Sequence, residues 1–404
     1  MKIAIIGGGA AGFFAALTAK KEYPKAEVTI YEKTSKVLGK VKISGGGRCN
    51  VTHACSENKL LATHYPRGEN YLKKAFEQFN ADSTIQWFKE RGVEMKTYPD
   101  GCIFPLSNDS QTIIDCFLSE ASKLGVKILY NKSVISIEKR ETIFNLQTRE
   151  NNYQTDRLII TIGGQPKRSG LEFLEKIGHS IIEPVPSLFT FNMPENPICE
   201  LMGNVVEKAT VKVEGTKLVG NGPLLVTHWG MSGPAILQLS AWGARILETE
   251  NYQFAILVNW LNDVKNEELR NFLDGIIYEH SQKMIGNLNP FPVTNRLWHF
   301  LLQKSKISLE IRWKDVGKKN INKLVNTLIN DRYEVKGKTT FKEEFVTAGG
   351  ISLKDVDIKT MESKKVAGLF LAGEVLDLDG ITGGFNFQSA WTTGFIAGKN
   401  CGYF

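Results

Sequence analysis

The chain has 404 residues, of which 42% are hydrophobic and 23% charged, and its formal net charge is +7 at pH 7. This length favours two or three domains over one core, and the composition is typical of globular proteins in water. No dense Lys/Arg block is interleaved with aromatic residues, and no run approaches the ~20 apolar residues of a membrane helix. We therefore expect no nucleic-acid partner and no membrane span.

The chain has six scattered cysteines, none of them in a CxxC pair or at zinc-type spacing from histidines. This pattern favours a reducing compartment, so we expect a cytoplasmic protein without a metal site. The apolar run from Ile3 to Ala19 resembles a signal peptide superficially, but four glycines interrupt it. A nucleotide-binding motif explains the run better.

Residues 2–33, KIAIIGGGAAGFFAALTAKKEYPKAEVTIYEK, predict strands over 3–6 and 28–31 with a glycine turn and a helix over 10–22 between them. Gly7, Gly9 and Gly12 form G-x-G-x-x-G. The first glycine permits the sharp turn, the second lets the backbone approach a pyrophosphate, and the third lets the helix approach the strand. The free N–H groups of the helix then face the phosphates.

Glu32 closes the second strand, 20 residues beyond Gly12. A carboxylate at this place accepts hydrogen bonds from the two hydroxyls of an adenosine ribose and repels a 2′-phosphate. The N-terminal motif fits NAD and FAD equally well, so by itself it leaves the choice between them open.

Residues 366–398, VAGLFLAGEVLDLDGITGGFNFQSAWTTGFIAG, predict a second half-site for the same cofactor. A buried strand over 368–372 ends at Gly373-Glu374, and a glycine-rich loop leads into a helix over 386–398. A helix N-terminus stabilises the negative charge that a reduced flavin gathers at its pyrimidine end. Asp377 is expected to hold the ribityl chain or the pyrophosphate. The two motifs together favour FAD.

These motifs, with ISGGGRCN at 43–50 between them, resemble the FAD-dependent HI0933-like flavoproteins, usually described as NAD(P)/FAD-dependent oxidoreductases. FP-x-S at 104–107, LLVTHWGMSGPAIL at 224–237 and FVTAGGIS at 345–352 are similar to further blocks of that family, in the same order. Residues 160–179 look like a shortened form of a family segment with a longer loop after its two glycines, so the contacts of that loop are not carried over.

Between the two motifs the pattern of hydrophobic and turn-forming residues changes twice. Residues 184–254 are typical of alternating strands, with turn signals at Pro194, Gly215 and Asn221-Gly222, and residues 263–331 are typical of helices. We expect an α/β protein with a Rossmann-type FAD-binding domain split over 1–183 and 345–404. An antiparallel β-rich, barrel-like domain is inserted over 184–262 and 332–344, and a helical subdomain is nested within it over 263–331. The resembled family has the same layout.

The motifs and the resemblance together predict a set of cofactor-binding residues but no catalytic acid or base. The set is Gly7, Gly9, Ala10, Ala11, Gly12, Glu32, Lys33, Lys40, Ser44, Gly45, Gly46, Gly47, Arg48, Cys49, Asn50, Val134, Gly163, Gly373, Glu374, Asp377, Gly383, Gly384, Asn386 and Phe387.

The stretch KVKISGGGRCNVTH, residues 40–53, fits by itself a phosphate loop, a cysteine nucleophile beside a histidine, a metal site or a flexible turn. Its place after Glu32 favours a contact with the flavin, because glycines let backbone N–H groups approach the ring and Lys40 and Arg48 supply positive charge. A nucleophilic Cys49 would need a lowered pKa. We favour a small residue packed near the flavin.

Gly230-Met231-Ser232-Gly233-Pro234 is not GxSxG, because proline replaces the second glycine, and it predicts a helix start instead of a hydrolase turn. His228, at the end of a strand, is expected to be structural.

We expect an FAD-dependent oxidoreductase that acts on a small organic molecule, with NAD(P)H as electron donor and transient co-substrate. A flavin amine or amino-ketone oxidase that uses oxygen is one alternative, and a flavin-bound binding or sensory module without turnover is another. Disulfide reduction is disfavoured, because the chain has no second G-x-G-x-x-G in its middle and no redox-active cysteine pair. The flavin carries the redox step in either enzyme.

Overall fold

The computed structural model describes residues 1–339 and 346–402. The chain divides into two compact units, unit 1 with Met1–Ser187 and Lys342–Phe404, and unit 2 with Leu188–Phe341. The finer division into three parts, with a separate helical subdomain, stays a prediction.

Unit 1 is built on a five-stranded parallel sheet with strand order β20-β10-β1-β2-β6. Its strands are β1 (Lys2–Ile6), β2 (Glu27–Tyr31), β6 (Lys127–Leu129), β10 (Arg157–Ile160) and β20 (Leu369–Leu371). The central strands are short apolar runs, as expected of strands that are covered on both faces. The first and the last segments of the unit thus lie in one sheet, which confirms the predicted Rossmann-type α/β class.

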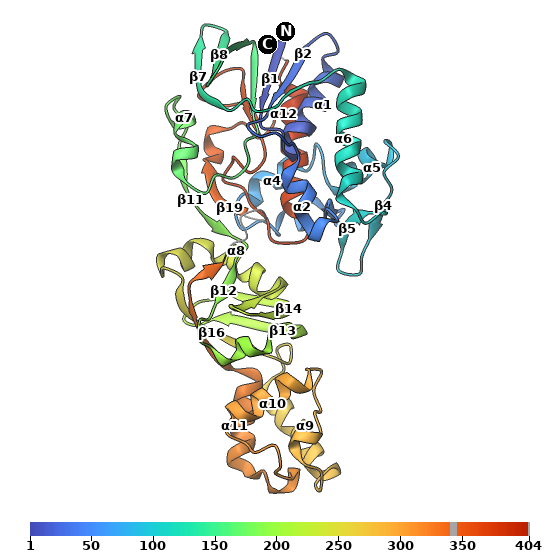
Figure 1. Ribbon diagram of the computed structural model, residues 1–404, viewed down its shortest axis with the longest axis vertical. Coiled ribbons are helices and arrows are strands. Elements are labelled where there is room, and N and C mark those ends of the chain that lie inside the picture. Colours follow the sequence, from blue (N-terminus) through green and yellow to red (C-terminus); the bar gives the residue numbers. More distant parts are fainter. Residues whose placement is uncertain (340–345, 403–404) are drawn as a thin grey trace. The chain divides into compact units, whose positions relative to one another are not determined.

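Helices α1 (Ala10–Glu22) and α12 (Phe385–Asn400) pack against each other beside this sheet (Figure 1). A Cβ at Gly394 would lie 2.6 Å from the Ala11 carbonyl oxygen, and one at Gly398 would collide with the Ala15 carbonyl. Glycine at both positions lets the two helices approach closely. The N-terminal and C-terminal motifs are therefore held together by direct helix packing.

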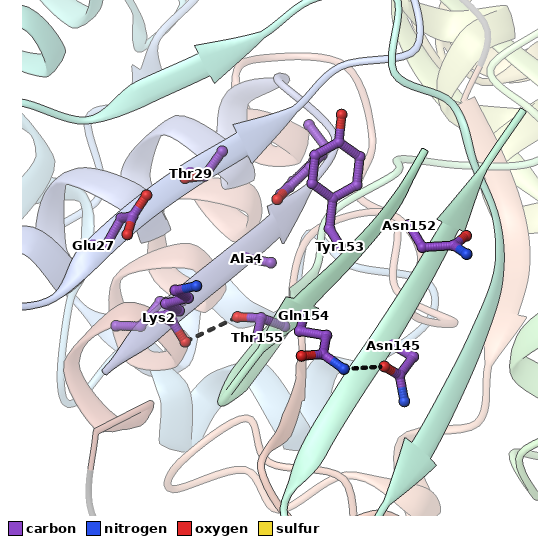
Figure 2. A pocket seen from close by; sticks show the side chains of 11 residues that line it. Lys2, Ala4, Glu27, Thr29, Asn145, Asn152, Tyr153, Gln154 and Thr155 are labelled. Carbon is purple, nitrogen blue, oxygen red and sulfur yellow. Dashed lines mark hydrogen bonds between the residues drawn. The ribbon is translucent and has the colours of Figure 1, made fainter. Parts of the chain in front are cut away.

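A three-stranded antiparallel sheet lies beside the parallel one and consists of β7 (Val134–Arg140), β8 (Ile143–Thr148) and β9 (Asn152–Thr155). A polar groove of about 590 Å³ runs between β1, β2 and this sheet (Figure 2). Thr155 donates to the Lys2 carbonyl at 2.9 Å, and Gln154 to the Asn145 side chain at 3.0 Å. No predicted cofactor-binding residue lines the groove, so it lies outside the candidate site.

The remaining elements of unit 1 are short apart from one helix of 15 residues, Ser110–Leu124. They are α2 (Gly39–Gly47), β3 (Thr52–His53), α3 (Asn58–Ala62), α4 (Glu69–Ala75), α5 (Ala81–Lys89), β4 (Met95–Thr97), β5 (Cys102–Pro105), α6 (Ser110–Leu124), α7 (Glu172–Glu175), β11 (Ile181–Ser187) and β19 (Val346–Ile351), with 3-10 turns at Arg168–Gly170 and Leu353–Asp355.

Unit 2 contains a separate seven-stranded antiparallel sheet with strand order β17-β16-β13-β14-β15-β12-β18. Its strands are β12 (Thr190–Asn192), β13 (Val205–Val213), β14 (Val219–Thr227), β15 (Gly230–Ser232), β16 (Gln253–Asn259), β17 (Asp331–Lys336) and β18 (Lys338–Thr339). The two edge strands, β17 and β18, are consecutive in the chain and separated only by Gly337. The Gly337 carbonyl also accepts from the Asn192 N–H, and the Gly337 N–H donates to the Tyr252 carbonyl. The sheet therefore curls back on itself, in line with the barrel-like prediction.

Helix α8 (Pro234–Thr249) packs on β14, and it starts at Pro234 with Gly233 as its N-cap, as the sequence predicts. The turn predicted at Asn221-Gly222 is wrong, because both residues lie inside β14. Gly222 pairs with Ala209, where the register of β13 shifts. An Asn-Gly pair there serves an irregular ladder instead of a hairpin.

Helices dominate the stretch between β16 and β17, as predicted. They are α9 (Asn266–Glu279), α10 (Asn295–Lys304) and α11 (Gly317–Ile329), with 3-10 turns at Ile285–Asn287 and Trp313–Asp315 between them. A further 3-10 turn at Pro197–Leu201 precedes β13. Trp298 and Trp313 are fully buried and stack at 6.3 Å between ring centroids, so the helices share an aromatic core. Among the described residues, no helix has both the length and the apolarity that a membrane crossing requires.

Candidate functional site

The candidate site lies at the carboxyl edge of the parallel sheet in unit 1. Parallel strands end at the same edge, so the residues that follow β1, β2, β10 and β20 come together there. The Gly7 N–H donates to the Tyr31 carbonyl at 2.9 Å, the Thr161 N–H to Ile6 and the Ala372 N–H to Ile160. Segments that are far apart in the sequence therefore meet at one edge.

The first glycine turn has the geometry that its motif predicts. Gly7 has a φ of 109°, and a Cβ there would collide with the Thr161 carbonyl. A Cβ at Gly12 would collide with the Gly7 carbonyl, whereas one at Gly9 would meet no atom within 4 Å. Two of the glycines are thus required by packing. The third leaves open space beside Ala10 and Ala11, the first residues of α1, where a ligand could approach the backbone.

Glu32 is buried, and its carboxylate is held by backbone donors. Oε2 accepts from the Gly8 N–H at 2.9 Å, and Oε1 accepts from the N–H and the hydroxyl of Thr34 at 2.8 and 2.9 Å. Lys132 donates its N–H to the Glu32 carbonyl, which places Val134, two residues later at the start of β7, near the same strand end. Lys33 is exposed.

The 40–53 stretch begins in a helix that breaks at its glycines, whereas the sequence by itself also fits a phosphate loop or a flexible turn there. Helix α2 begins at Gly39, and its backbone leaves helical geometry at Ser44, Gly45 and Gly46, with φ of 58° and 68° at the two glycines. Cβ atoms at Gly46 and Gly47 would meet nothing within 4 Å. The break thus exposes backbone on an open side. The Ser44 hydroxyl donates to the Val41 carbonyl at 3.0 Å.

The side chains that follow the break are used for packing. The Arg48 guanidinium lies 4.3 Å from the centroid of the Phe104 ring. Cys49 is fully buried, and burial raises the pKa of its thiol to about 12, which argues against a nucleophilic role. In the orientation that satisfies both ends of its amide, Asn50 donates to the Thr52 and Ile103 carbonyls and accepts from the Gly384 N–H at 3.2 Å.

Glu374, in the turn after β20, links three segments of the site. One carboxylate oxygen pairs with the Lys40 ammonium at 2.7 Å, and the other accepts from the Thr347 N–H at 2.9 Å. The charge of Lys40 therefore has a protein carboxylate as partner. Gly373 and Gly163, which follow β20 and β10, have φ of 78° and 73°, and a Cβ at Gly163 would meet no atom.

The N-terminus of α12 is positioned by aromatic stacking around its first residue, Phe385. The His53 and His64 rings stack on Phe385 at 4.6 and 4.3 Å, and the Tyr65 hydroxyl donates to the Phe385 carbonyl at 2.6 Å. The His53 Nδ1 lies 3.1 Å from the Gly383 carbonyl, and burial lowers the pKa of this imidazole. A neutral His53 therefore donates to the loop before the helix.

The other predicted residues of this loop shape it or line it. The Asn386 amide both donates to and accepts from the Gly380 backbone at 2.8 Å. Phe387 stacks on Trp391 at 5.4 Å. Gly384 caps α12 with a φ of 92°, and Asp377 is half-buried in the same loop, with its N–H donating to the Ile351 carbonyl. The structure thus brings the predicted residues of this loop together with the 45–53 segment, and their role toward a cofactor stays a prediction.

Sequence reasoning missed a buried ion pair beside this loop. Asp379 has no exposed surface, and its carboxylate pairs with the Arg67 guanidinium and accepts from the Ser187 hydroxyl at 2.8 Å. Burial raises the pKa of Asp379, and the guanidinium opposes that effect. Nothing in the sequence around Arg67 signals this partner, which lies 312 positions away. The contacts of His53 and His64 with Phe385 were also not predicted, although His53 lies in the 40–53 stretch.

Comparison with protein families decides the membership of the chain. The HI0933-like protein Rossmann domain family matches residues 1–400. The chain belongs to this family. The match spans both units and confirms the resemblance that the sequence motifs predicted.

Three curated relatives span nearly the whole chain. The 3-dehydro-bile acid delta(4,6)-reductase of Clostridium scindens is 26% identical over 98% of both proteins. The ribosomal RNA dihydrouridine synthase of Escherichia coli is 28% identical over 98% of this chain and 96% of its own. A protein of the same name from Haemophilus influenzae is 28% identical over 97% of this chain and 96% of its own.

Among solved structures, the 3-ketosteroid delta1-dehydrogenase of Sterolibacterium denitrificans, in complex with 1,4-androstadiene-3,17-dione, superposes with a TM-score of 0.53. It is 11% identical over 99% of this chain and 98% of its own. The FrdA subunit of E. coli quinol fumarate reductase gives 0.50 at 14% identity over 99% and 70%. At such identities the likeness establishes a shared fold and nothing about the reaction.

Proposed function

We propose that this protein is an FAD-dependent reductase of a carbon–carbon double bond conjugated to a carbonyl group. The observation that carries the proposal is the convergence of two glycine-rich turns, each followed by a helix, at one edge of the sheet. Helix α1 follows one turn and α12 follows the other, with Glu32 and the break in α2 between them. The two helix N-termini provide two places that favour negative charge in one site.

The residues present fit FAD. The open space at Gly9 and the free first turn of α1 suit a pyrophosphate, and the buried Glu32 carboxylate suits the hydroxyls of the adenosine ribose. The open backbone at Gly46 and Gly47 suits a flat ring, because no Cβ lies in the way. The first turn of α12, which begins at Phe385, would supply backbone N–H groups for the pyrimidine end of that ring.

FAD, when bound, supplies two-electron hydride chemistry, which the protein positions and tunes. The first N–H groups of α12 stabilise negative charge near their end of the site. The Lys40–Glu374 pair contributes little net charge, so we assign it to holding α2 against the turn after β20. Cys49, with a pKa raised to about 12, holds its proton and takes no part.

The named relatives support the choice of substrate bond. A delta(4,6)-reductase of a 3-dehydro bile acid reduces double bonds conjugated to a ring ketone. A dihydrouridine synthase reduces the C5–C6 double bond of uracil, which is conjugated to the C4 carbonyl. Both reactions deliver a hydride to the carbon β to a carbonyl and a proton to the α carbon. We propose this shared reaction for the present chain, and we do not propose that it acts on either complete substrate.

We propose NAD(P)H as the electron donor, docking without a nucleotide domain of its own, because the sequence has a single G-x-G-x-x-G motif of this kind. An amine or amino-ketone oxidase remains the second candidate from the sequence. The two candidates differ in the compound that reduces the flavin, which is a nicotinamide for the reductase and an amine for the oxidase.

Purified protein supplied with FAD tests the proposal. We expect a yellow protein whose colour bleaches without oxygen on addition of NADH or NADPH. The colour then returns on addition of a 3-oxo-4-ene steroid or a uridine-containing RNA.

A protein that stays colourless with FAD overturns the cofactor assignment. Bleaching by a primary amine instead of a nicotinamide identifies an oxidase. A reduced flavin that neither unsaturated compound reoxidises contradicts the proposed substrate bond.

A further inference from the structure

The positive charge of the chain is concentrated in one stretch of unit 2. Residues 283–338 contain 12 Lys and Arg residues against 4 Asp and Glu residues, a surplus of eight, whereas the whole chain has a net charge of +7. The remaining residues therefore carry a slight negative excess. A strong local surplus of one sign attracts a ligand of the opposite sign.

Helix α11 presents a polar face that lacks acidic residues. Its sequence, GKKNINKLVNTLI, contains neither Asp nor Glu, and one side packs into the core. The buried side consists of Ile321, Leu324, Val325, Thr327 and Leu328. On the other side Lys318, Lys319 and Lys323 are exposed, with Asn322 and Asn326 beside them.

Two exposed cations, Arg312 and Lys314, precede α11 in the chain. We call these two residues together with Lys318, Lys319 and Lys323 the α11 basic surface. Within the described residues, none of the five has an ion-pair partner. Two nearby cations do have carboxylate partners. Lys304 pairs with Asp331 at 2.5 Å, and Arg332 pairs with Glu214 at 3.0 Å. Lys319 and Lys323 are spaced i, i+4 on the helix, where like charges repel. An anionic ligand would relieve this repulsion.

An exposed aromatic side chain lies close to this surface in the chain fold. Tyr278, in the last turn of α9, is 87% exposed. Three residues later the Ser281 carbonyl accepts from the Lys314 N–H at 3.1 Å, so the end of α9 meets the start of the basic surface. Single-stranded nucleic acids bind where cations follow the backbone and an aromatic ring stacks on a base.

We propose that the α11 basic surface binds the phosphate backbone of RNA and that Tyr278 stacks on an unpaired base. Between Arg312 and Lys323 the described residues include no exposed large hydrophobic side chain, although a helix that lies on a membrane inserts several. Asn326 adds a donor and an acceptor of the kind that ribose hydroxyls use, whereas the Asn322 side-chain oxygen already accepts from the Arg270 guanidinium. RNA therefore fits this surface better than lipid does.

The inference deepens the proposed function and rests on it in one respect, since it selects uracil in RNA over a free unsaturated ketone as the substrate. RNA binding itself is measured without any redox step. A protein that binds RNA but reduces nothing refutes the proposed function alone. A protein that reduces a free ketone but binds no RNA refutes the present inference alone.

The test uses the full chain and a fluorescein-labelled RNA stem–loop with an unpaired uridine-rich loop, with anisotropy measured over a series of salt concentrations. In K318Q/K319Q/K323Q we expect the slope of log K against log salt to become less negative by about 2, from roughly 0.7 per lost phosphate contact. At about 0.1 M salt this corresponds to roughly 100-fold weaker binding. Glutamine preserves the helix, because its helix propensity is close to that of lysine.

The matched control, K21Q/K25Q/K89Q, removes the same charge from exposed lysines of unit 1, and we expect its slope to equal that of the wild type. Tyr278→Ala is expected to weaken binding by about tenfold with an unchanged slope, because stacking releases no counterions. Tyr130→Ala, which removes a 40% exposed tyrosine of unit 1, serves as its control.

Three outcomes overturn the inference. The first is no RNA binding by the wild type at low salt, and the second is an equal loss in the two lysine triple variants. The third is tighter binding to vesicles of anionic phospholipid than to RNA, lost in K318Q/K319Q/K323Q, which would identify a membrane surface instead.

Discussion

Breaking the Arg67–Asp379 pair is expected to destabilise unit 1 severely and to weaken FAD binding. Asp379 has no exposed side-chain surface and Arg67 only 13%, and the pair joins the segment before α4 to the loop that leads into α12. Arg67→Met leaves the carboxylate buried without its cation. Removing one partner of a buried pair costs about 3–5 kcal/mol.

That loss corresponds to a fall in Tm of roughly 6–20 °C for a unit of this size. Because the loop carries Gly383 and Gly384, we also expect weaker FAD affinity, measured by titration of the apoprotein. Calorimetry of wild type and variant gives the change in stability of unit 1.

A double-mutant cycle separates the pair from other effects. Asp379→Asn in the Arg67→Met background removes the unpaired charge, so we expect the double variant to be more stable than Arg67→Met. Lys127→Met is the matched control, because Lys127 and Glu27 form an exposed pair with 62% and 47% exposed side chains. It is expected to cost about 1 kcal/mol or less. Equal losses in Arg67→Met and Lys127→Met, or additive effects in the cycle, would refute the reasoning.

Gly9→Ala is expected to leave Tm unchanged and to weaken FAD binding about tenfold or more, because its methyl group meets no protein atom but occupies the proposed ligand space. The control is Gly275→Ala in α9, which should leave FAD binding unchanged and raise Tm slightly, because alanine favours a helix interior more than glycine does. Cys49, buried with a thiol pKa near 12, is expected to resist alkylation until the protein unfolds, as peptide mass spectrometry would reveal, and rapid labelling would contradict this. Burial lowers the pKa of His53 and His179 below 6.5 in the folded protein, so the unfolded chain binds protons first as the pH falls below about 6.5. Tm should therefore decrease over this pH range. A Tm that stays constant down to about pH 5.5 would contradict the two lowered pKa values.

The sequence by itself determined the first and the last elements of unit 1. The run from Ile3 to Glu32 encodes a strand, a turn, a helix and a second strand through local rules, and the structure has α1 at the predicted bounds, Ala10–Glu22. The late helix after Gly384 and the helix start at Pro234 were predictable for the same reason. Glycine, proline and apolar periodicity act within a few residues, so they can be recognised without the fold.

Tertiary structure decided which distant residues meet and how charge is distributed in space. Arg67 pairs with Asp379, and His53 and His64 stack on Phe385, although more than 300 positions separate the partners in each pair. The residues adjacent to each partner in the sequence do not indicate these contacts. The Asn221-Gly222 pair lies in a strand because its neighbours impose a ladder there. Because no dense block of basic and aromatic residues occurs in the sequence, it predicts no nucleic-acid partner. Only folding places Lys318, Lys319 and Lys323 on one face, because a helix brings residues three and four positions apart together.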